Sequence, residues 1–146
     1  MIKLVAAVLT IFQFILIALL IVLSDFSQPS IFSFLIFLIT VCLSVWILIH
    51  NRPGNFNIVP MVKKSAELVN SGPYKYVRHP MYSLILISSI VCLIESTTIG
   101  LSVLCYLLLF LDLFFKARIE ENFLRKHFPN YAEMMTAKKR FFPLLI

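Results

Sequence analysis

Charge, glycine and cysteine are all scarce in this chain, and their scarcity excludes several classes of protein. Charged residues make up only 14% of the 146 residues and glycine occurs 3 times, whereas 60% of the residues are hydrophobic. A soluble domain is about one quarter charged and about half apolar, and a globule of this size could not bury so much apolar surface. A soluble globule, a disordered chain and a multidomain assembly are therefore excluded, and lipid must act as part of the solvent.

The three cysteines give no sign of a disulfide scaffold or of a metal site. Cys42, Cys92 and Cys105 all lie inside apolar runs, and no two of them have the Cys-x-x-Cys spacing. No set of His, Cys or carboxylate residues has the ligand spacing of a zinc site either. Each cysteine is therefore predicted to be a small buried hydrophobe.

The apolar residues fall into four runs that predict four transmembrane helices: 4–24, 31–49, 81–97 and 101–115. The first two runs hold no charged residue and are about as long as a bilayer-spanning helix requires. The first is too long for the apolar part of a cleavable signal peptide, and no small-x-small cleavage site follows it. We therefore expect an all-α, polytopic membrane protein that forms one domain over residues 1–146.

All thirteen Lys and Arg residues fall on one side of this predicted bundle. The turns over 25–30 and 95–100 have none, whereas Lys3, the loop over 50–80 and the tail over 116–146 hold them all. By the positive-inside rule, both termini and the loop are expected in the cytoplasm. The net charge of +6 then reflects orientation and not nucleic-acid binding. The tail is expected to form an amphipathic helix beside the loop.

The loop ends in a dense string, residues 68–82, for which two interpretations are open. Gly72-Pro73 is a turn signal, and Arg78-His79 precede Pro80, which suits the first turn of a helix. Such a helix start favours an anion, so a carboxylate or a phosphate could be held there. Alternatively, the cations only set the topology and the tyrosines form an aromatic belt at the membrane interface. These tyrosines are Tyr74, Tyr76 and Tyr82.

A second polar group follows the fourth apolar run. If the helix continues there, Arg118, Glu121 and Asn122 lie on one face at i, i+3 and i+4, and Glu120 faces another way. This cation and the two carboxylates at the mouth of the membrane could hold a polar ligand with charges of both signs. A solvated, ion-paired helix end is the alternative. Asp112 lies deeper, and an ionisable residue within a span is a functional candidate. Lys116 at position i+4 gives a structural explanation instead, an ion pair with Asp112, and we favour this explanation.

The string Leu68-Val69-x-x-Gly72-Pro73-Tyr74-x-x-x-Arg78-His79-Pro80-x-Tyr82 is followed by Arg118-x-Glu120-Glu121, then by Phe128-x-x-Tyr131 and Pro143. This pattern resembles the isoprenylcysteine carboxyl methyltransferase family and, more distantly, the phospholipid N-methyltransferases of membranes. The resemblance covers about residues 50–143. This chain departs from the family in having Ala66-Glu67 where His-Thr often precedes the Leu-Val pair.

The resemblance implies S-adenosylmethionine as methyl donor and S-adenosylhomocysteine as product, in a cytoplasmic pocket that is not of Rossmann type. It also implies that a cation just before the carboxylates handles the substrate; Arg118 is the nearest match, and Lys116 is the alternative. The family's cofactor contacts map onto Leu68, Val69, Tyr74, Arg78, His79, Pro80, Met81, Tyr82, Glu120 and Glu121.

We therefore expect methyl transfer to a lipophilic acceptor that enters from the bilayer. A carboxylate or thiolate acceptor needs no general base, and the loop offers no base except His79, which the resemblance assigns to the cofactor. A phospholipid amine N-methyltransferase is the alternative within this class. A four-span transporter would carry an acidic residue in an early span, and a membrane interaction protein would leave residues 68–82 unexplained. The acceptor, the oligomeric state and the role of the first two spans stay open.

Overall fold

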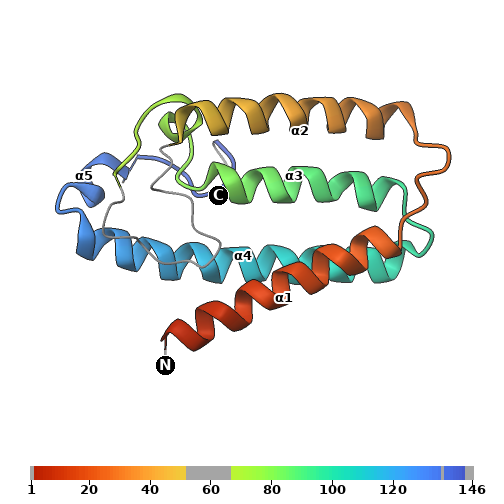
Figure 1. Cartoon of the computed structure of the whole chain (residues 1–146), viewed down its shortest axis with the longest axis horizontal. Helices are drawn as coiled ribbons and strands as arrows, with labels where there is room; N and C mark the ends of the chain where they lie inside the picture. Colours follow the sequence, from red (N-terminus) through yellow and green to blue (C-terminus); the bar gives the residue numbers. More distant parts are fainter. Residues whose placement is uncertain (1, 52–66, 136, 144–146) are drawn as a thin grey trace.

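The computed structural model describes residues 2–51, 67–135 and 137–143, and its regular elements are all helices (Figure 1). They are α1 (Ile2–Val22), α2 (Ile31–His50), the 3-10 helix η2 (Gly72–Lys75), α3 (Pro80–Ile94), α4 (Ile99–His127) and α5 (Tyr131–Met135). In the described ranges, extended backbone pairs only at two isolated bridges, and no strand forms there. The predicted all-α class is confirmed.

Three helices, α1, α2 and α4, are long and apolar enough to cross a membrane. Many large apolar side chains of α1 and α2 face outward, as expected where lipid is the solvent. The apolar helix α3 has only 15 residues. At 1.5 Å per residue it is about 22 Å long, whereas the hydrocarbon core of a bilayer is about 30 Å thick. Three of the four predicted runs thus form candidate membrane spans in the described residues, as expected of an integral membrane protein, and the fourth span stays a prediction.

The tail begins differently from the prediction. Its residues 116–127 continue α4 without a break, and the only further helix in its described part is α5, which has five residues. The reason is that no glycine or proline follows Gly100 until Pro129, so nothing stops the helix at the end of the apolar run. A separate amphipathic helix is therefore not formed in the described part of the tail.

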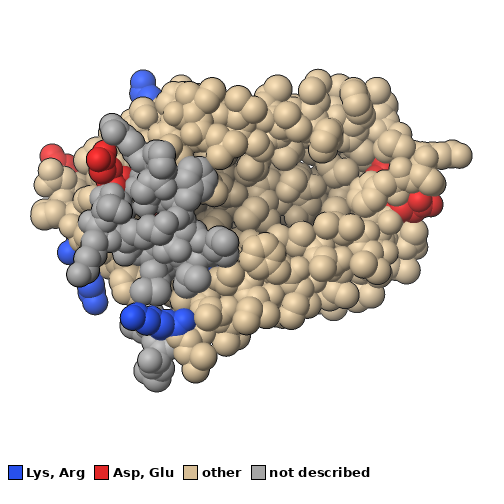
Figure 2. Space-filling model, in the orientation of Figure 1, with Lys and Arg blue, Asp and Glu red and all other residues tan. Residues whose placement is uncertain are grey.

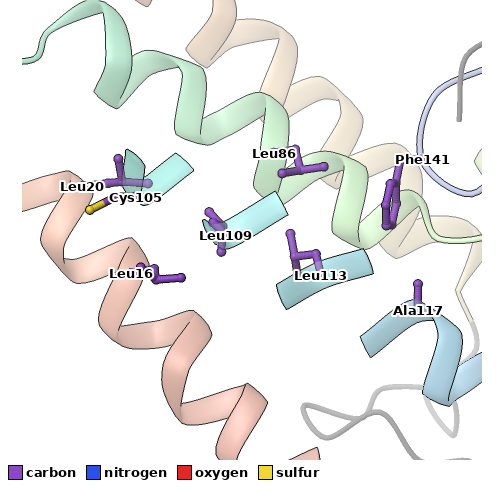
Figure 3. Close-up of a cluster of buried hydrophobic side chains, with 8 residues drawn as sticks. All are labelled: Leu16, Leu20, Leu86, Cys105, Leu109, Leu113, Ala117 and Phe141. Carbon is purple, nitrogen blue, oxygen red and sulfur yellow. The ribbon is translucent and has the colours of Figure 1, made fainter. Parts of the chain in front are cut away.

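The helices pack around a core that lies along α4. In Figure 1, α3 lies between α2 and α4, and α1 crosses α4 at an angle. Figure 3 shows the side chains of this core, which come from α1, α3, α4 and the end of the chain. They are Leu16, Leu20, Leu86, Cys105, Leu109, Leu113, Ala117 and Phe141. All three cysteines are free; Cys105 is buried as predicted, but Cys42 faces outward from α2.

The two turns without Lys or Arg lie together at one end of the bundle. The Asp25 amide donates to the Glu95 carbonyl oxygen (2.8 Å), and the Glu95 carboxylate accepts from the Ser30 amide (2.8 Å). Ser30 also caps α2 by accepting from the Ser33 amide. On the face drawn in Figure 2, Lys and Arg gather at the opposite end and the middle is uncharged. This distribution fits a bilayer around the middle, while the side that faces the cytoplasm stays a prediction.

A tight turn precedes α3. Gly72 has φ +54°, the left-handed region that favours glycine, and a Cβ on it would lie 2.3 Å from Cγ of His50 at the end of α2. Pro73 follows inside η2, and Pro80 opens α3. The predicted turn and helix start are both confirmed.

The end of the chain returns to this turn. Within residues 137–143, which we call the C-terminal segment, Lys139 lies parallel to Val77. The Lys139 carbonyl oxygen accepts from the Arg78 amide, and the Arg140 carbonyl oxygen accepts from the His79 amide, both at 2.9 Å. The C-terminal segment therefore runs alongside the residues that lead into α3.

Candidate functional site

Six side chains from three parts of the chain meet at the end of the bundle opposite the turns without Lys or Arg. We call them the carboxylate cluster: Arg78, His79, Tyr82, Glu120, Glu121 and Arg140. The start of α3 supplies three of them, the last turns of α4 supply the two carboxylates, and the C-terminal segment supplies the last. The long α4 thus brings a sequence-distant carboxylate pair against the start of α3.

Glu121 is the saturated carboxylate of the cluster. Its side chain is 3% exposed and accepts from Arg78 Nη1 (3.0 Å), Arg140 Nε (3.0 Å) and Arg140 Nη2 (3.2 Å). His79 Nε2 lies 3.4 Å from the same carboxylate. Hydrogen bonds between ionised groups are the strong ones in proteins. Glu121 therefore has little capacity left for a ligand and fixes the two arginines and the histidine.

Glu120 is the more available carboxylate. Its side chain is 31% exposed, and its Oε2 accepts from the Tyr82 hydroxyl (2.9 Å) and lies 3.6 Å from His79 Nδ1. Within the described residues both contacts use this one oxygen. The other oxygen of Glu120 is therefore the candidate acceptor for a ligand.

His79 is buried between the two carboxylates. Its ring stacks on the Tyr82 ring at a centroid distance of 5.4 Å and an angle of 12°. Burial alone would lower the pKa of His79, but the carboxylates of Glu120 and Glu121 outweigh burial, and the net pKa is raised above 6.5. The protonated form of His79 is thus favoured inside the cluster.

Burial and the charges of the cluster raise the pKa of two further tyrosines. Burial and the charge of Glu120 raise the pKa of the Tyr74 phenol, and burial and the charge of Glu121 raise the pKa of Tyr131 to about 12. The buried Tyr131 hydroxyl has no hydrogen-bond partner among the described residues. Both phenols are therefore neutral donors near neutral pH.

An apolar pocket adjoins the cluster. Its volume is about 190 Å³, and its walls come from α2, the turn around η2, α3 and the C-terminal segment. They include Trp46, Ile47, Tyr76, Pro80, Leu84 and Phe141. The Phe141 ring stands between the pocket and the cluster, 6.4 Å from the ring centroids of both His79 and Tyr82. A polar site and an apolar cavity therefore share one wall.

The two cations considered for substrate handling take different positions. Arg118 is exposed, with its guanidinium 5.0 Å from the centroid of the Phe114 ring, and no hydrogen bond or ion pair joins it to Glu120 or Glu121 in the described part of the chain. Lys116 is 1% exposed and points into the bundle. The structure thus brings Lys116, and not Arg118, to the interior behind the cluster.

The predicted ion pair between Asp112 and Lys116 was wrong. The Lys116 ammonium instead donates to the Gln13 amide oxygen of α1 at 2.5 Å. Both carboxylate oxygens of Asp112 are buried without a hydrogen-bond partner in the described ranges. The neutral amide of α1 is therefore the partner of Lys116 where the sequence spacing predicted a carboxylate.

The remaining predicted contacts surround the cluster without joining it. Leu68 and Val69 are half-buried ahead of η2, and Pro80 is buried in the wall of the apolar pocket. Met81 is exposed, and its sulfur accepts from Asn51 Nδ2 at 3.7 Å. Residues 52–66 of the predicted cofactor loop, which include Ala66, lie outside the described residues. The cofactor assignments of these positions stay predictions.

Sequence reasoning missed two residues that the structure places at the site. Arg140 was one cation in a basic run near the end of the chain, with no spacing to single it out. Gln13 gave a usable signal, because it is the only side-chain amide in the first apolar run and a polar residue inside a span is a functional candidate.

Comparisons with known proteins support a methyltransferase family. The model of the isoprenylcysteine carboxyl methyltransferase (ICMT) family matches residues 32–126. Over 85 residues the chain is 36% identical to the cobalt-zinc-cadmium resistance protein CzcN of Cupriavidus metallidurans, a match that covers 57% of this chain and 38% of that protein. The chain therefore matches less than two fifths of the length of this relative. Among the described residues, no group of three or more His, Cys, Asp or Glu side chains could hold a metal ion.

Proposed function

The chain belongs to the isoprenylcysteine carboxyl methyltransferase family, and on this premise we propose that it transfers a methyl group from S-adenosylmethionine to a lipophilic acceptor that reaches the site from the bilayer. The observation that carries the proposal is the meeting of Arg78 and His79 with Glu120 and Glu121 beside an apolar pocket. One site there offers anion-binding, cation-binding and apolar surfaces side by side.

The chemistry of the cluster fits this donor. Bound S-adenosylmethionine would supply a sulfonium methyl group, which is the electrophile of an in-line displacement. The molecule also carries an ammonium group, a carboxylate and ribose hydroxyls. The Glu120 oxygen that neither Tyr82 nor His79 contacts suits the ammonium group or a hydroxyl. The buried Tyr131 hydroxyl, which has no partner among the described residues, is a donor near Glu121 that suits an acceptor of the ligand. Arg78 and protonated His79 suit the carboxylate.

In this proposal, the residues of the site position the two reactants and do not exchange protons with them. Glu121 fixes Arg78, Arg140 and His79, and Tyr82 fixes Glu120. Holding both reactants in line in a dry site is the main source of rate in such a displacement. A carboxylate or thiolate acceptor would arrive already ionised and would need no base from the cluster.

The apolar pocket suits the hydrocarbon part of the acceptor. Its walls are mostly apolar. The Ser83 hydroxyl in the wall donates to the Phe141 carbonyl oxygen at 2.5 Å and is thereby satisfied. Binding of apolar surface contributes about 25 cal/mol per Å². A lipid chain held here would place its polar end next to the wall formed by Phe141. An amine-bearing phospholipid is the alternative acceptor within the same class.

The proposal is tested by calorimetric titration of the full chain, in lipid nanodiscs, with S-adenosylmethionine. We expect saturable binding that weakens about 10- to 100-fold in His79→Ala and in Glu120→Gln, since a hydrogen bond to a charged group contributes about 1.5–3 kcal/mol. Lys126→Met, an exposed change on the same helix as Glu120, is the control and should bind as the unsubstituted protein does. Absence of binding, or equal binding by all variants, would overturn the proposal.

The acceptor is identified with labelled donor. Nanodiscs carrying the protein are supplied with total membrane lipid and S-adenosylmethionine labelled in its methyl group. Base-labile label in the lipid fraction identifies a methyl ester, whereas label stable to mild base in a headgroup amine identifies N-methylation. Base-stable label in the lipid fraction outside the headgroup amines identifies a methyl thioether. Absence of label from the lipid fraction would overturn the lipophilic acceptor.

A further inference from the structure

A buried ammonium group lies directly behind the carboxylate cluster. Lys116, on the last turns of α4, is 1% exposed and its Nζ donates to Gln13 Oε1 at 2.5 Å. Gln13 lies in the middle of α1 and is itself 7% exposed. An ammonium has three donors, and burying it without compensation is costly. The contact with α1 is therefore a specific polar tether in an otherwise apolar interface.

This tether continues into the cluster through Tyr82. The Lys116 ammonium lies 5.9 Å from the centroid of the Tyr82 ring. The same ring stacks on His79, and its hydroxyl donates to Glu120 at 2.9 Å. A cation at this distance from an aromatic face is attracted to it. An unbroken line of contacts therefore leads from α1 through Lys116 and Tyr82 to Glu120.

Lys116 has a second possible partner on its own helix. Asp112 lies one turn earlier, where an i, i+4 pair can meet, and its buried carboxylate oxygens have no hydrogen-bond partner in the described part of the chain. The ammonium nevertheless lies on Gln13. Without Gln13, the attraction of a buried carboxylate would draw the ammonium toward Asp112 and away from Tyr82.

We propose that Gln13 of α1 is a positioning residue for the methyl-donor site: it holds Lys116 against Tyr82, so that Tyr82 keeps Glu120 oriented toward the donor. This inference rests on the proposed function. It gives the first span a role in the site, although α1 lies outside residues 32–126, the part that matches the family.

The test compares three variants of the full chain in lipid nanodiscs by calorimetric titration with S-adenosylmethionine and by thermal melting. Gln13→Leu removes the tether at nearly equal volume. Gln13→Glu keeps an acceptor oxygen for Lys116 and is the conservative rescue. Leu16→Ala leaves a cavity one turn away in the core between α1 and α4 and controls for loosened packing alone.

We expect Gln13→Leu to weaken donor binding about two- to thirtyfold, which is the range of a cation–π contact, and Gln13→Glu to bind nearly as the unsubstituted protein. Leu16→Ala should lower the melting temperature and leave donor affinity unchanged. If Gln13→Leu does not fold, Gln13→Met is measured in its place.

Unchanged binding by Gln13→Leu or Gln13→Met, or an equal loss in Leu16→Ala, would overturn the inference and leave the proposed function intact. A failure of Gln13→Glu to restore binding would also overturn it. A lack of binding by the unsubstituted protein would instead overturn the proposed function, and the inference with it.

Discussion

Replacing Glu121 by glutamine tests whether one buried carboxylate fastens the end of the chain to the start of α3. The change keeps the shape of the side chain and removes its charge, so Arg78 and Arg140 lose their common anion. Removing one partner of a buried ion pair costs about 3–5 kcal/mol. The two arginine side chains are 17% and 23% exposed and can be partly rehydrated. The glutamine oxygen also still accepts, so we expect a loss nearer about 2–3 kcal/mol.

This loss should be concentrated in the C-terminal segment. Arg140 reaches the cluster from that segment, whose backbone carbonyl oxygens also accept from the Arg78 and His79 amides, from Arg78 Nε and from the Ser83 hydroxyl. Where a protease cleaves a transiently open state, its rate follows the population of that state. At 1.4 kcal/mol per tenfold, the expected loss corresponds to cleavage about 30- to 150-fold faster.

The assay is digestion by trypsin in nanodiscs, with cleavage after Lys138, Lys139 and Arg140 followed by mass spectrometry. Glu120→Gln is the matched control, because Glu120 contacts Tyr82 and His79, and in the described residues no hydrogen bond or ion pair joins it to the C-terminal segment. Its cleavage rate should stay within about threefold of the unsubstituted rate, as for a change of less than ~0.7 kcal/mol. Equal rates for the Glu121 and Glu120 variants would refute the reasoning.

Two further predictions concern the turn before α3 and the buried histidine. Gly72→Ala should destabilise the fold by about 1–3 kcal/mol in thermal melting, because Gly72 has a positive φ and an added Cβ would clash with the His50 ring. Gly100→Ala is the control and should be neutral or stabilising, because nothing lies within 4 Å of the added Cβ. Equal effects of the two substitutions on the melting temperature would contradict the argument. Since the pKa of His79 is raised above 6.5, its charge stabilises the fold below pH 6.5 and this contribution is lost as the pH rises through the raised pKa. The melting temperature should fall over that range, and less steeply in Glu120→Gln; an equal slope in that variant would count against the histidine as the titrating group.

The helices could be predicted from the sequence because lipid imposes a simple rule. An uncharged run of about twenty residues predicts a span whatever its neighbours are, and α1 and α2 match their predicted runs to within two residues. The end of α4 could not be predicted in this way, because the apolar run stops at residue 115 whereas the helix continues until a proline interrupts the sequence. Polarity marks where a span ends and not where a helix ends.

The site was predictable only in part, for a related reason. Spacing and resemblance singled out the Arg78-His79 and Glu120-Glu121 pairs, and the structure brings the two pairs together. Neither signal could predict that Glu121 is paired with arginines whereas Glu120 keeps an oxygen for a ligand. This difference depends on which arginines reach each carboxylate from other parts of the chain. Likewise, the i, i+4 rule favoured Asp112 as the partner of Lys116, but the rule describes one helix alone and takes no account of an amide on a neighbouring helix.

The two residues that complete the site lie on opposite sides of the region that matches the family. Gln13 precedes residues 32–126 and Arg140 follows them, yet one holds Lys116 and the other neutralises Glu121. A buried carboxylate without a cation, or a buried ammonium without an acceptor, costs more than the contact contributes. The matched region alone would therefore contain Lys116 and Glu121 without the Gln13 amide oxygen and the Arg140 guanidinium that partner them. We infer that Gln13 and Arg140, one from each side of the matched region, supply the partners of these buried charges and so belong to the proposed site.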